Sequence, residues 1–281
     1  MAIAALYRTV MSHPLGSRRP LHSFGRIASW QLRSRLQSPR VVDWVNGRKL
    51  SVSRGDTGAT GNIYFHLHEV ADMAFFAHLL RPGDVFIDAG ANIGSYTILA
   101  SANAARIESF EPAPETVVKL RRNIELNGAD ASIHTVALGH ENGQAHFTFG
   151  NDCVNALAPD GETVVEVRTL DSFDFAPVAM KMDLEGGEEN ALAGASATLK
   201  KDSLLALEVE TVSPASARLL EDAGFARRWY DPFSRAIRRE PTGRANNQLW
   251  VRDEEAVARR VAEGPDIRYR DRSVLAAPSG T

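Results

Sequence analysis

The sequence predicts an α/β fold in which helices cover both faces of a mostly parallel β-sheet. After residue 84, short apolar runs alternate with segments whose apolar residues recur at helical spacing, as in strand–helix–strand units. The turn after the first run is rich in glycine, as in open α/β sheets that bind a ligand beyond their strand ends. The chain has 281 residues, 44% hydrophobic and 24% charged, which excludes a disordered or collagen-like protein.

The cysteine content and the hydropathy exclude two further classes of protein. The single cysteine, Cys153, rules out an intramolecular disulfide and hence a disulfide-stapled secreted scaffold. No stretch approaches about 18 uninterrupted apolar residues, so we expect no transmembrane segment. Cys153 has no partner base motif and is not expected to be a nucleophile. We predict that the polar stretch 149–163 around it is a substrate-side loop.

The N-terminal 42 residues form a basic arm with seven arginines and no acidic residue. Because the whole chain has a net charge of −3, the remainder carries −10. Such an arm fits a solvated extension, an anionic-surface or nucleic-acid contact, or an Arg-rich transit peptide. We expect a solvated extension, and no secretory signal, because Arg8 interrupts the short apolar start.

Residues 41–68 are predicted to be rich in β-structure. Asn46-Gly47 suits the tight turn of a hairpin over residues 41–52. Residues 55–61 contain three glycines and are predicted to be a second loop. His66 and His68 would then alternate on one face of a strand. They could bind a metal or supply a base, but a structural surface pair is favoured.

The remaining elements follow from apolar spacing and from breakers such as Pro82-Gly83 and Asn127-Gly128. The pattern predicts helices over 70–80, from 95, over 115–126 and over 215–223, with strands over 85–87, 106–110, 132–137, 180–182, 204–209, 225–230 and 248–252. The last two strands are expected to be an antiparallel pair, and the tail from residue 253 a short helix that then frays. The predicted organisation is an arm and hairpin over 1–60, a main domain over 61–252 and a charged tail over 253–281.

The glycine-rich turn carries the strongest functional signal. An apolar strand leads into Asp88, and Gly90, Asn92 and Gly94 follow at alternate positions. Glycine lets such a turn bend tightly and approach a ligand closely. Asn92 stands where a dinucleotide fingerprint needs glycine, and a carboxylate beside the loop repels pyrophosphate. An Asp-x-Gly-x-Asn-x-Gly turn suits the cationic S-adenosylmethionine, although a tight turn without ligand is the alternative.

A second acid strengthens this interpretation. Glu111 ends the next predicted strand, 23 residues after Asp88. An acid about 20 residues beyond the loop can accept both hydrogen bonds of a ribose diol. The two elements together therefore favour a nucleoside-containing ligand.

With the fourth strand included, the chain resembles the FkbM-type methyltransferases. The matching segments are 82–94, Phe-Glu-Pro-x-Pro at 110–114, Asn123 with Asn127, Thr169-Leu170-Asp171, Lys-Met-Asp-Leu-Glu-Gly-x-Glu at 181–188 and Leu-Glu-Val-Glu at 207–210. Their order and spacing fit across about residues 60–252. The resemblance implies a Rossmann-like class I methyltransferase fold, with a seven-stranded sheet, an antiparallel last strand and, here, a small N-terminal β-rich extension.

The resemblance also implies which residues bind the cofactor S-adenosylmethionine. The methionine part would lie on Asp88, Gly90, Asn92 and Gly94, the ribose on Glu111 and the adenine near Ala137, with Glu69 close to the cofactor. Family members of known activity mostly methylate hydroxyls on sugars or secondary metabolites. Gly187 departs from the family pattern, which often has a bulky residue there, so the acceptor does not carry over.

Asp183, at the tip of the fourth predicted strand, is the candidate general base, because an alcohol acceptor must lose its proton as the new bond forms. The alternative role for Asp183 is to order the loop or the helix start. Glu185, Glu188 and Glu210 could join it in a site for Mg²⁺ or a similar divalent metal, although we do not favour metal use.

Other classes of function remain as alternatives. A non-catalytic S-adenosylmethionine-binding module is the second hypothesis, and the glycine spacing opposes a nicotinamide dehydrogenase. Nucleic acid is not favoured as a partner, because the Asn/Asp-Pro-Pro-aromatic motif is absent after the fourth strand and the body is acidic. We expect a small-molecule or glycan acceptor with a hydroxyl group. The 27 arginines against 5 lysines suggest a GC-rich bacterial genome and a cytoplasmic location.

Overall fold

The computed structural model describes residues 3–148, 156–157, 163–241 and 247–278. Its main sheet has eight strands in the order β13-β12-β14-β11-β10-β3-β4-β5. In that order the strands are Ala236–Arg238, Ala226–Asp231, Gln248–Val251, Ala206–Val209, Ala179–Met182, Val85–Ala89, Arg106–Phe110 and Ala131–His134. Strands β11, β10, β3, β4 and β5 are parallel, and β14 runs antiparallel to both neighbours. This confirms the predicted fold class, with β13 added to the seven expected strands through a hairpin with β12.

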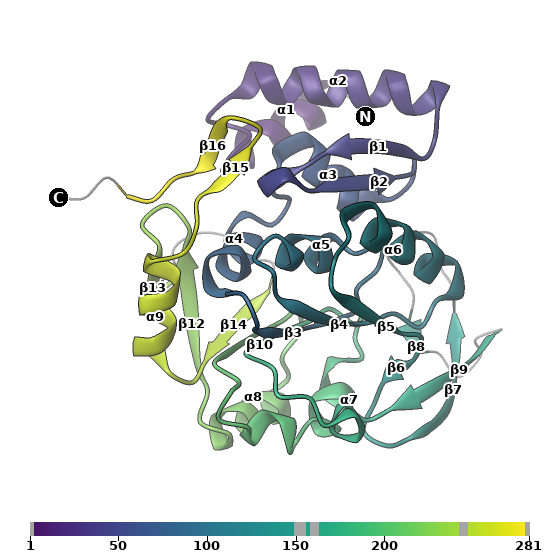
Figure 1. Ribbon diagram of the computed structural model, residues 1–281, viewed down its shortest axis with the longest axis vertical. Coiled ribbons are helices and arrows are strands. Elements are labelled where there is room, and N and C mark those ends of the chain that lie inside the picture. The colour runs from purple at the N-terminus through teal and green to yellow at the C-terminus, as the bar shows by residue number, and fades with distance from the viewer. Residues whose placement is uncertain (1–2, 149–155, 158–162, 242–246, 279–281) are drawn as a thin grey trace.

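Helices cover both faces of the sheet (Figure 1). On one face lie α4 (Val70–Leu79), α5 (Ser95–Ser101) and α6 (Pro114–Asn127), and on the other α7 (Glu188–Ala193) and α8 (Pro214–Asp222). All four residues of both β10 and β11 are buried, as expected for central strands that are covered on both sides. This arrangement directs the carboxyl ends of β3, β4 and β10 to one edge, where the loops form the site.

The predicted strand over 132–137 divides in two. Strand β5 ends at His134, and β6 (Ala137–Leu138) pairs with β9 in a second, four-stranded sheet. The other strands of that sheet are β7 (Gly143–Thr148), β8 (Ala156–Leu157) and β9 (Thr163–Arg168). Cys153 and most of the stretch 149–163 lie outside the described residues.

The basic arm is not a solvated extension, which corrects the prediction. Residues 3–36 form α1 (Ile3–Ser12) and α2 (Pro20–Leu36), and the second helix buries Ile27 and Trp30. The hairpin was predicted correctly, as β1 (Arg40–Asp43) and β2 (Lys49–Val52). The N-terminal extension is therefore mainly helical. Both helices pack apolar side chains into the protein, because Val10 of α1 and Ile27 and Trp30 of α2 are buried.

The predicted glycine loop and histidine strand are also wrong, because residues 57–65 form the helix α3 (Thr57–Phe65). An added Cβ at Gly61 would lie only 2.2 Å from the His68 ring, so glycine is needed for this close approach. The helix ends at Phe65, and the C-cap residue His66 that follows it has a φ of +73°. His66 and His68 therefore share no strand face.

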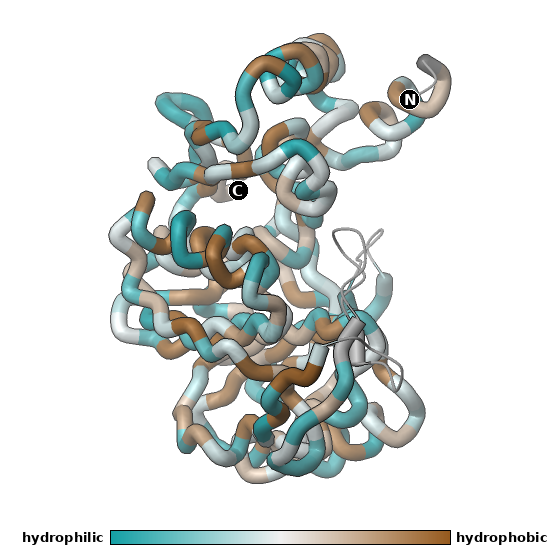
Figure 2. Tube along the Cα trace, turned by 90° about the vertical axis from the view of Figure 1, so that its right-hand side faces the viewer, coloured by the Kyte–Doolittle hydropathy of each residue, from teal (hydrophilic) through white to brown (hydrophobic). Residues whose placement is uncertain are grey.

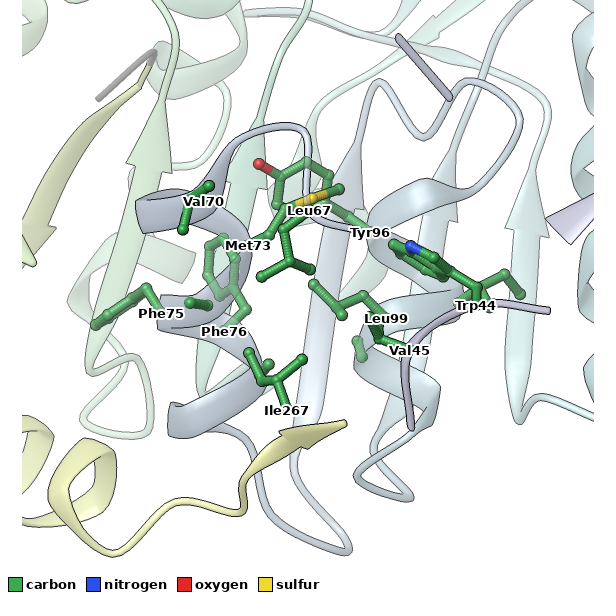
Figure 3. Close-up of a cluster of buried hydrophobic side chains, with 14 of the residues drawn as sticks. Trp44, Val45, Leu67, Val70, Met73, Phe75, Phe76, Tyr96, Leu99 and Ile267 are labelled. Carbon is green, nitrogen blue, oxygen red and sulfur yellow. The ribbon is translucent and has the colours of Figure 1, made fainter. Parts of the chain in front are cut away.

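The C-terminal tail continues beyond the expected helix. After α9 (Glu254–Ala262) it forms a hairpin of β15 (Ile267–Tyr269) and β16 (Arg272–Leu275) instead of fraying. Ile267 packs into a cluster with Trp44, from the N-terminal extension, and Phe76, from α4 (Figure 3). Side chains from all three predicted segments thus share one core, while the segment boundaries themselves stay a prediction. The described residues also contain three short 3₁₀ helices, over Val45–Gly47, Leu170–Phe173 and Thr198–Lys200.

Candidate active site

A pocket lies at the carboxyl ends of β3, β4 and β10. It is lined by the glycine loop, by the residues after β4 and β10, and by the start of α3. Six of the eight predicted site residues line it, namely Glu69, Gly90, Asn92, Glu111, Ala137 and Asp183. Asp88 and Gly94 do not. The elements that the sequence placed far apart therefore converge on one cavity.

The glycine loop is fixed by backbone contacts. Gly90 and Gly94 have φ values of +82° and +94°, in the region that favours glycine. The amides of Gly90 and Ala91 both donate to the carbonyl oxygen of Phe110, at 3.0 and 2.9 Å. The loop consequently turns across the end of β4 and presents its edge to the pocket.

Glu111 ties the loop to the end of β4. Its Oε2 accepts a hydrogen bond from the Asn92 amide at 3.0 Å, and its Oε1 accepts one from the Ala113 amide at 2.9 Å. The side chain is 5% exposed, and burial raises the pKa of Glu111 to about 7 even though both amides lower it. Each carboxylate oxygen has two lone pairs, so each can accept one more bond from a ligand.

Asp88 lies beneath the loop rather than in the pocket. It is 1% exposed, and the hydroxyl of Thr97 donates to its Oδ2 at 2.6 Å. Burial raises the pKa of Asp88, against the opposing influence of Thr97 and of the Lys181 charge. Asp88 therefore links the start of α5 to β3. Its effect on a bound ligand is indirect, through the position of the glycine loop.

Lys181 is a charged pocket residue to which the sequence analysis assigned no role. It is 2% exposed, its Nζ lies 2.7 Å from Asp183 Oδ2, and it stands 4.5 Å from the centroid of the Tyr96 ring. Burial lowers the pKa of Lys181, but Asp183 and Glu69 outweigh burial, so the net shift is upward. The sequence contains a signal for this role, because Lys181 lies inside an otherwise apolar strand, two residues before an acid.

A buried acid stands beside this lysine in the sheet. Glu208 on β11 is the register partner of Lys181 and is 1% exposed. Its Oε2 has no hydrogen-bond partner among the described residues, and burial raises the pKa of Glu208 well above its usual value. Tyr96 donates to Glu69 Oε2 at 2.6 Å. Lys181 is thus the cation about which Asp183, Glu208 and Glu69 are arranged.

Asp183 lines the pocket with about a third of its side chain exposed. The carboxyl of Glu210 forms a hydrogen bond with it, and burial together with the Asp183 charge raises the pKa of Glu210 to about 7. Glu210 can therefore keep its own proton at neutral pH and donate it in the hydrogen bond to Asp183. Glu185 also lines the pocket, and burial raises its pKa.

Glu188 has a structural role in the turn that leads into α7. It is 1% exposed, and its Oε1 accepts from the amides of Leu184 at 2.8 Å and Gly186 at 3.4 Å, which orders the turn into α7. Within the described residues there is no group of three or more His, Cys, Asp or Glu side chains placed to hold a metal ion.

The start of α3 closes one side of the pocket. Asp56, Thr57 and Gly58 line it, although they belong to the N-terminal extension. Lys119 on α6 binds Asp56 Oδ1 at 2.7 Å, and the Ser53 amide donates to Oδ2 at 2.6 Å. His68 lines the same wall, whereas His66 faces Tyr269, with ring centroids 4.3 Å apart. His66 and His68 therefore do not form the surface pair that the sequence predicted.

Comparisons with known proteins place the chain in a family. It is 32% identical over 118 residues to the 31-O-demethyl-FK506 methyltransferase FkbM of Streptomyces tacrolimicus, covering 39% of this chain and 45% of that one. It is 31% identical over 147 residues to Methyltransferase 1 of Beauveria bassiana, covering 40% and 59%. The matches thus span about half the length of these relatives. A solved FkbM methyltransferase from Methylobacillus flagellatus KT aligns with a TM-score of 0.41 and 17% identity, over 81% of this chain and 59% of that one.

The family model covers most of the site described above, including the glycine loop, Glu111 and Asp183. The methyltransferase FkbM domain matches residues 88–229, which is about half of the chain and runs from the glycine loop to β12. The sheet order, with β14 antiparallel, agrees with the Rossmann-like methyltransferase fold expected from the sequence. The chain therefore belongs to the FkbM methyltransferase domain family.

Proposed function

We propose that this protein is an S-adenosylmethionine-dependent methyltransferase whose acceptor is a hydroxyl group of a small molecule or glycan, such as a sugar or a secondary metabolite. The observation that carries the proposal is the convergence of the glycine loop, Glu111 and Asp183 on one pocket. Family membership supports methyl transfer. The name of the Streptomyces relative, which specifies an O-demethyl acceptor, supports oxygen as the atom methylated.

The charge of the pocket fits this cofactor. Among the described residues, its lining contains five carboxyl groups, from Asp56, Glu69, Glu111, Asp183 and Glu185, and one lysine, which is already paired with Asp183. Such a lining suits a ligand with an ammonium and a sulfonium group and opposes a pyrophosphate. Gly90, Asn92 and Glu69 would hold the methionine part. Glu111, with its free lone pairs, would hold the ribose.

The chain's own residues would bind, align and deprotonate the acceptor. When bound, the cofactor supplies a methyl carbon that its sulfonium makes electrophilic, so alignment is the main requirement. Asp183 accepts the hydroxyl proton as the oxygen–carbon bond forms and the carbon–sulfur bond breaks. Lys181 holds Asp183 Oδ2 in place. Glu210 forms a hydrogen bond with Asp183, and because its pKa is raised to about 7, Glu210 loses its own proton only near and above neutral pH.

The cofactor half of the proposal is tested by calorimetric titration with S-adenosylmethionine and S-adenosylhomocysteine. Both should bind the wild-type protein, and Glu111→Ala should lose about tenfold to hundredfold in affinity, because a charged hydrogen-bond acceptor is removed. Glu115→Ala, at an exposed acid four residues further along, is the matched control. Absence of binding to the folded wild-type protein would contradict the proposal.

The acceptor half is tested with isotopically labelled cofactor against hydroxylated sugars and then secondary metabolites. Asp183→Asn should keep the affinity for S-adenosylhomocysteine and lose about 10²- to 10⁴-fold in turnover. A protein that binds the cofactor but methylates no acceptor would instead be the non-catalytic binding module. A cytoplasmic location is part of the same proposal and is testable by cell fractionation.

A further inference from the structure

The outward face of α2 carries an exposed apolar stripe. The side chains of Leu21, Leu32 and Leu36 are 82%, 64% and 81% exposed. At about 100° per residue, these positions and the exposed Gly25 and Ala28 fall along one side of the helix. Figure 2 shows hydrophobic positions on this helix at the top of the molecule, and Figure 1 shows that α2 forms its outermost layer. The stripe is therefore apolar surface that the fold itself leaves uncovered.

The opposite face of α2 anchors the helix to the protein. Ile27 and Trp30 are 4% and 5% exposed, and Gln31 Nε2 donates to the Tyr64 hydroxyl on α3 at 2.8 Å. Arg26 Nε also donates to the Tyr64 carbonyl oxygen at 2.8 Å. Since one face is fixed in this way, the leucine stripe cannot rotate inward to join the core. It is held permanently toward the surroundings.

The surface around the stripe is strongly basic. Helical geometry places the exposed Arg33 on one side of the stripe and the exposed Arg35 on the other, and no acid occurs before Asp43. Apolar exposure is concentrated in the same segment. Within the described residues, six of the eight large exposed hydrophobic side chains lie between residues 7 and 41, namely Tyr7, Met11, Leu21, Leu32, Leu36 and Val41.

We propose that the α2 face, defined as Leu21, Leu32, Leu36, Arg33 and Arg35, docks the protein on the surface of an anionic lipid bilayer. Leucine side chains on a helix that lies in the plane of the interface enter the boundary between headgroups and acyl chains, while flanking arginines bind the lipid phosphates. With a charge of −10, the remainder of the chain is repelled by such a surface, so only this end faces it. Within the residues that the structure places, no helix combines the length and hydropathy that a membrane span requires, and docking requires none.

Charge argues against a second copy of the chain as the occupant. A two-fold symmetric contact through this face would bring Arg33 and Arg35 of one copy against the same arginines of the other. The first 42 residues contain no acidic residue that could offset this repulsion. An anionic lipid surface provides the missing opposite charge and the apolar environment together.

Co-sedimentation of the full chain with vesicles tests the apolar part of the proposal. The vesicles contain phosphatidylcholine with about 30 mol% phosphatidylglycerol, and vesicles of pure phosphatidylcholine are the comparison. Wild-type protein should bind the anionic vesicles at least about tenfold more tightly. The triple variant Leu21→Ser, Leu32→Ser, Leu36→Ser should lose about tenfold or more. Val118→Ser with Val164→Ser, at exposed valines 68% and 52% accessible on other elements, is the matched control and should bind as wild type.

A charge-reversal pair tests the electrostatic part. Arg33→Glu with Arg35→Glu should abolish binding, whereas Arg121→Glu with Arg122→Glu, at exposed positions on α6, should weaken it far less. Circular dichroism melts establish that each variant is folded. Failure of the wild type to bind anionic vesicles, or equal binding to neutral ones, overturns the proposal. So does a wild-type dimer in light scattering that the leucine variant makes monomeric.

Discussion

A Cβ atom at Gly90 would lie 1.8 Å from the carbonyl oxygen of Asp183. The glycine loop and the tip of the fourth parallel strand are therefore in direct backbone contact, and the Asp183 amide also donates to the Ala89 carbonyl at 3.0 Å. The residue at the centre of the proposed cofactor loop and the proposed base are held by the same contact. A displacement of the backbone at Gly90 must therefore also displace the backbone at Asp183.

Gly90→Ala should destabilise the protein by about 3 kcal/mol and abolish cofactor binding, because the methyl group meets backbone atoms that cannot move aside. Gly83→Ala is the matched control. It has a similar φ of +85°, but open space around the added Cβ. The control should cost only about 1 kcal/mol from backbone strain. Urea unfolding of both variants measures the difference, and equal losses would show that the contact is unimportant.

The affinity for S-adenosylmethionine should rise with pH through about 7. The pKa of Glu111 is about 7, and the ionised carboxylate is the better acceptor for the ribose hydroxyls. Calorimetric titration at about one pH unit below and above this pKa measures the effect, which should be close to tenfold. Glu111→Gln cannot ionise, so its weaker binding should vary much less over the same range. An unchanged pH dependence in Glu111→Gln would assign the effect to another group.

Lys181→Met should destabilise the protein by about 2–3 kcal/mol at neutral pH, because Asp183 would lose the buried cation with which it is paired. The loss should shrink in acid, where protonated carboxyls no longer need a counter-charge. Lys201→Met is the matched control, since Lys201 pairs with the exposed Asp174. Urea unfolding of both variants at neutral and acidic pH distinguishes them. If Lys201→Met were destabilised as much as Lys181→Met, the burial of Lys181 would not explain its effect on stability.

His78 should make the protein less stable as the pH falls. It is fully buried, its Nδ1 lies 2.6 Å from the Tyr230 hydroxyl, and burial with the nearby Arg235 charge lowers the pKa of His78 to about 3. Between about pH 6.5 and 3 the unfolded chain binds this proton and the folded chain does not, so each pH unit costs about 1.4 kcal/mol.

The test compares the pH dependence of the unfolding free energy in wild type and in His78→Gln. The variant should lose some stability at neutral pH and show a shallower decline in acid. His22→Gln, at an exposed position on α2, should leave the slope unchanged. Parallel slopes for wild type and His78→Gln would show that this histidine does not carry the effect.

Much of the main sheet could be predicted because its information is local. The strand before Asp88, the glycine turn and the strand that ends before Glu111 each lie within a few residues of the features that define them. Their parallel order then brings the two ends together by the general geometry of the fold. The same reasoning placed Glu111 and Asp183 on one pocket, as the structure has them.

The N-terminal helices and the pocket wall were missed because their signals are not local. Gly58 and Gly61 disfavour a helix in isolation, yet α3 forms, with Gly61 packed closely against the His68 ring. Trp30 of α2 is buried, and the neighbouring Gln31 forms a hydrogen bond with Tyr64 of α3, a residue 33 positions away in the sequence. Tertiary contacts thus overrode the propensities from which a loop was predicted.

The sequence by itself determined the α/β sheet, the glycine turn and the acids at the ends of the strands, because these follow from periodicity and from the backbone needs of glycine. Only the tertiary structure decided that Asp88 lies under the loop, that Lys181 is buried among carboxylates and that α2 turns a leucine stripe outward. The physical reason is that burial and charge compensation depend on neighbours from distant segments. No window of sequence contains those neighbours.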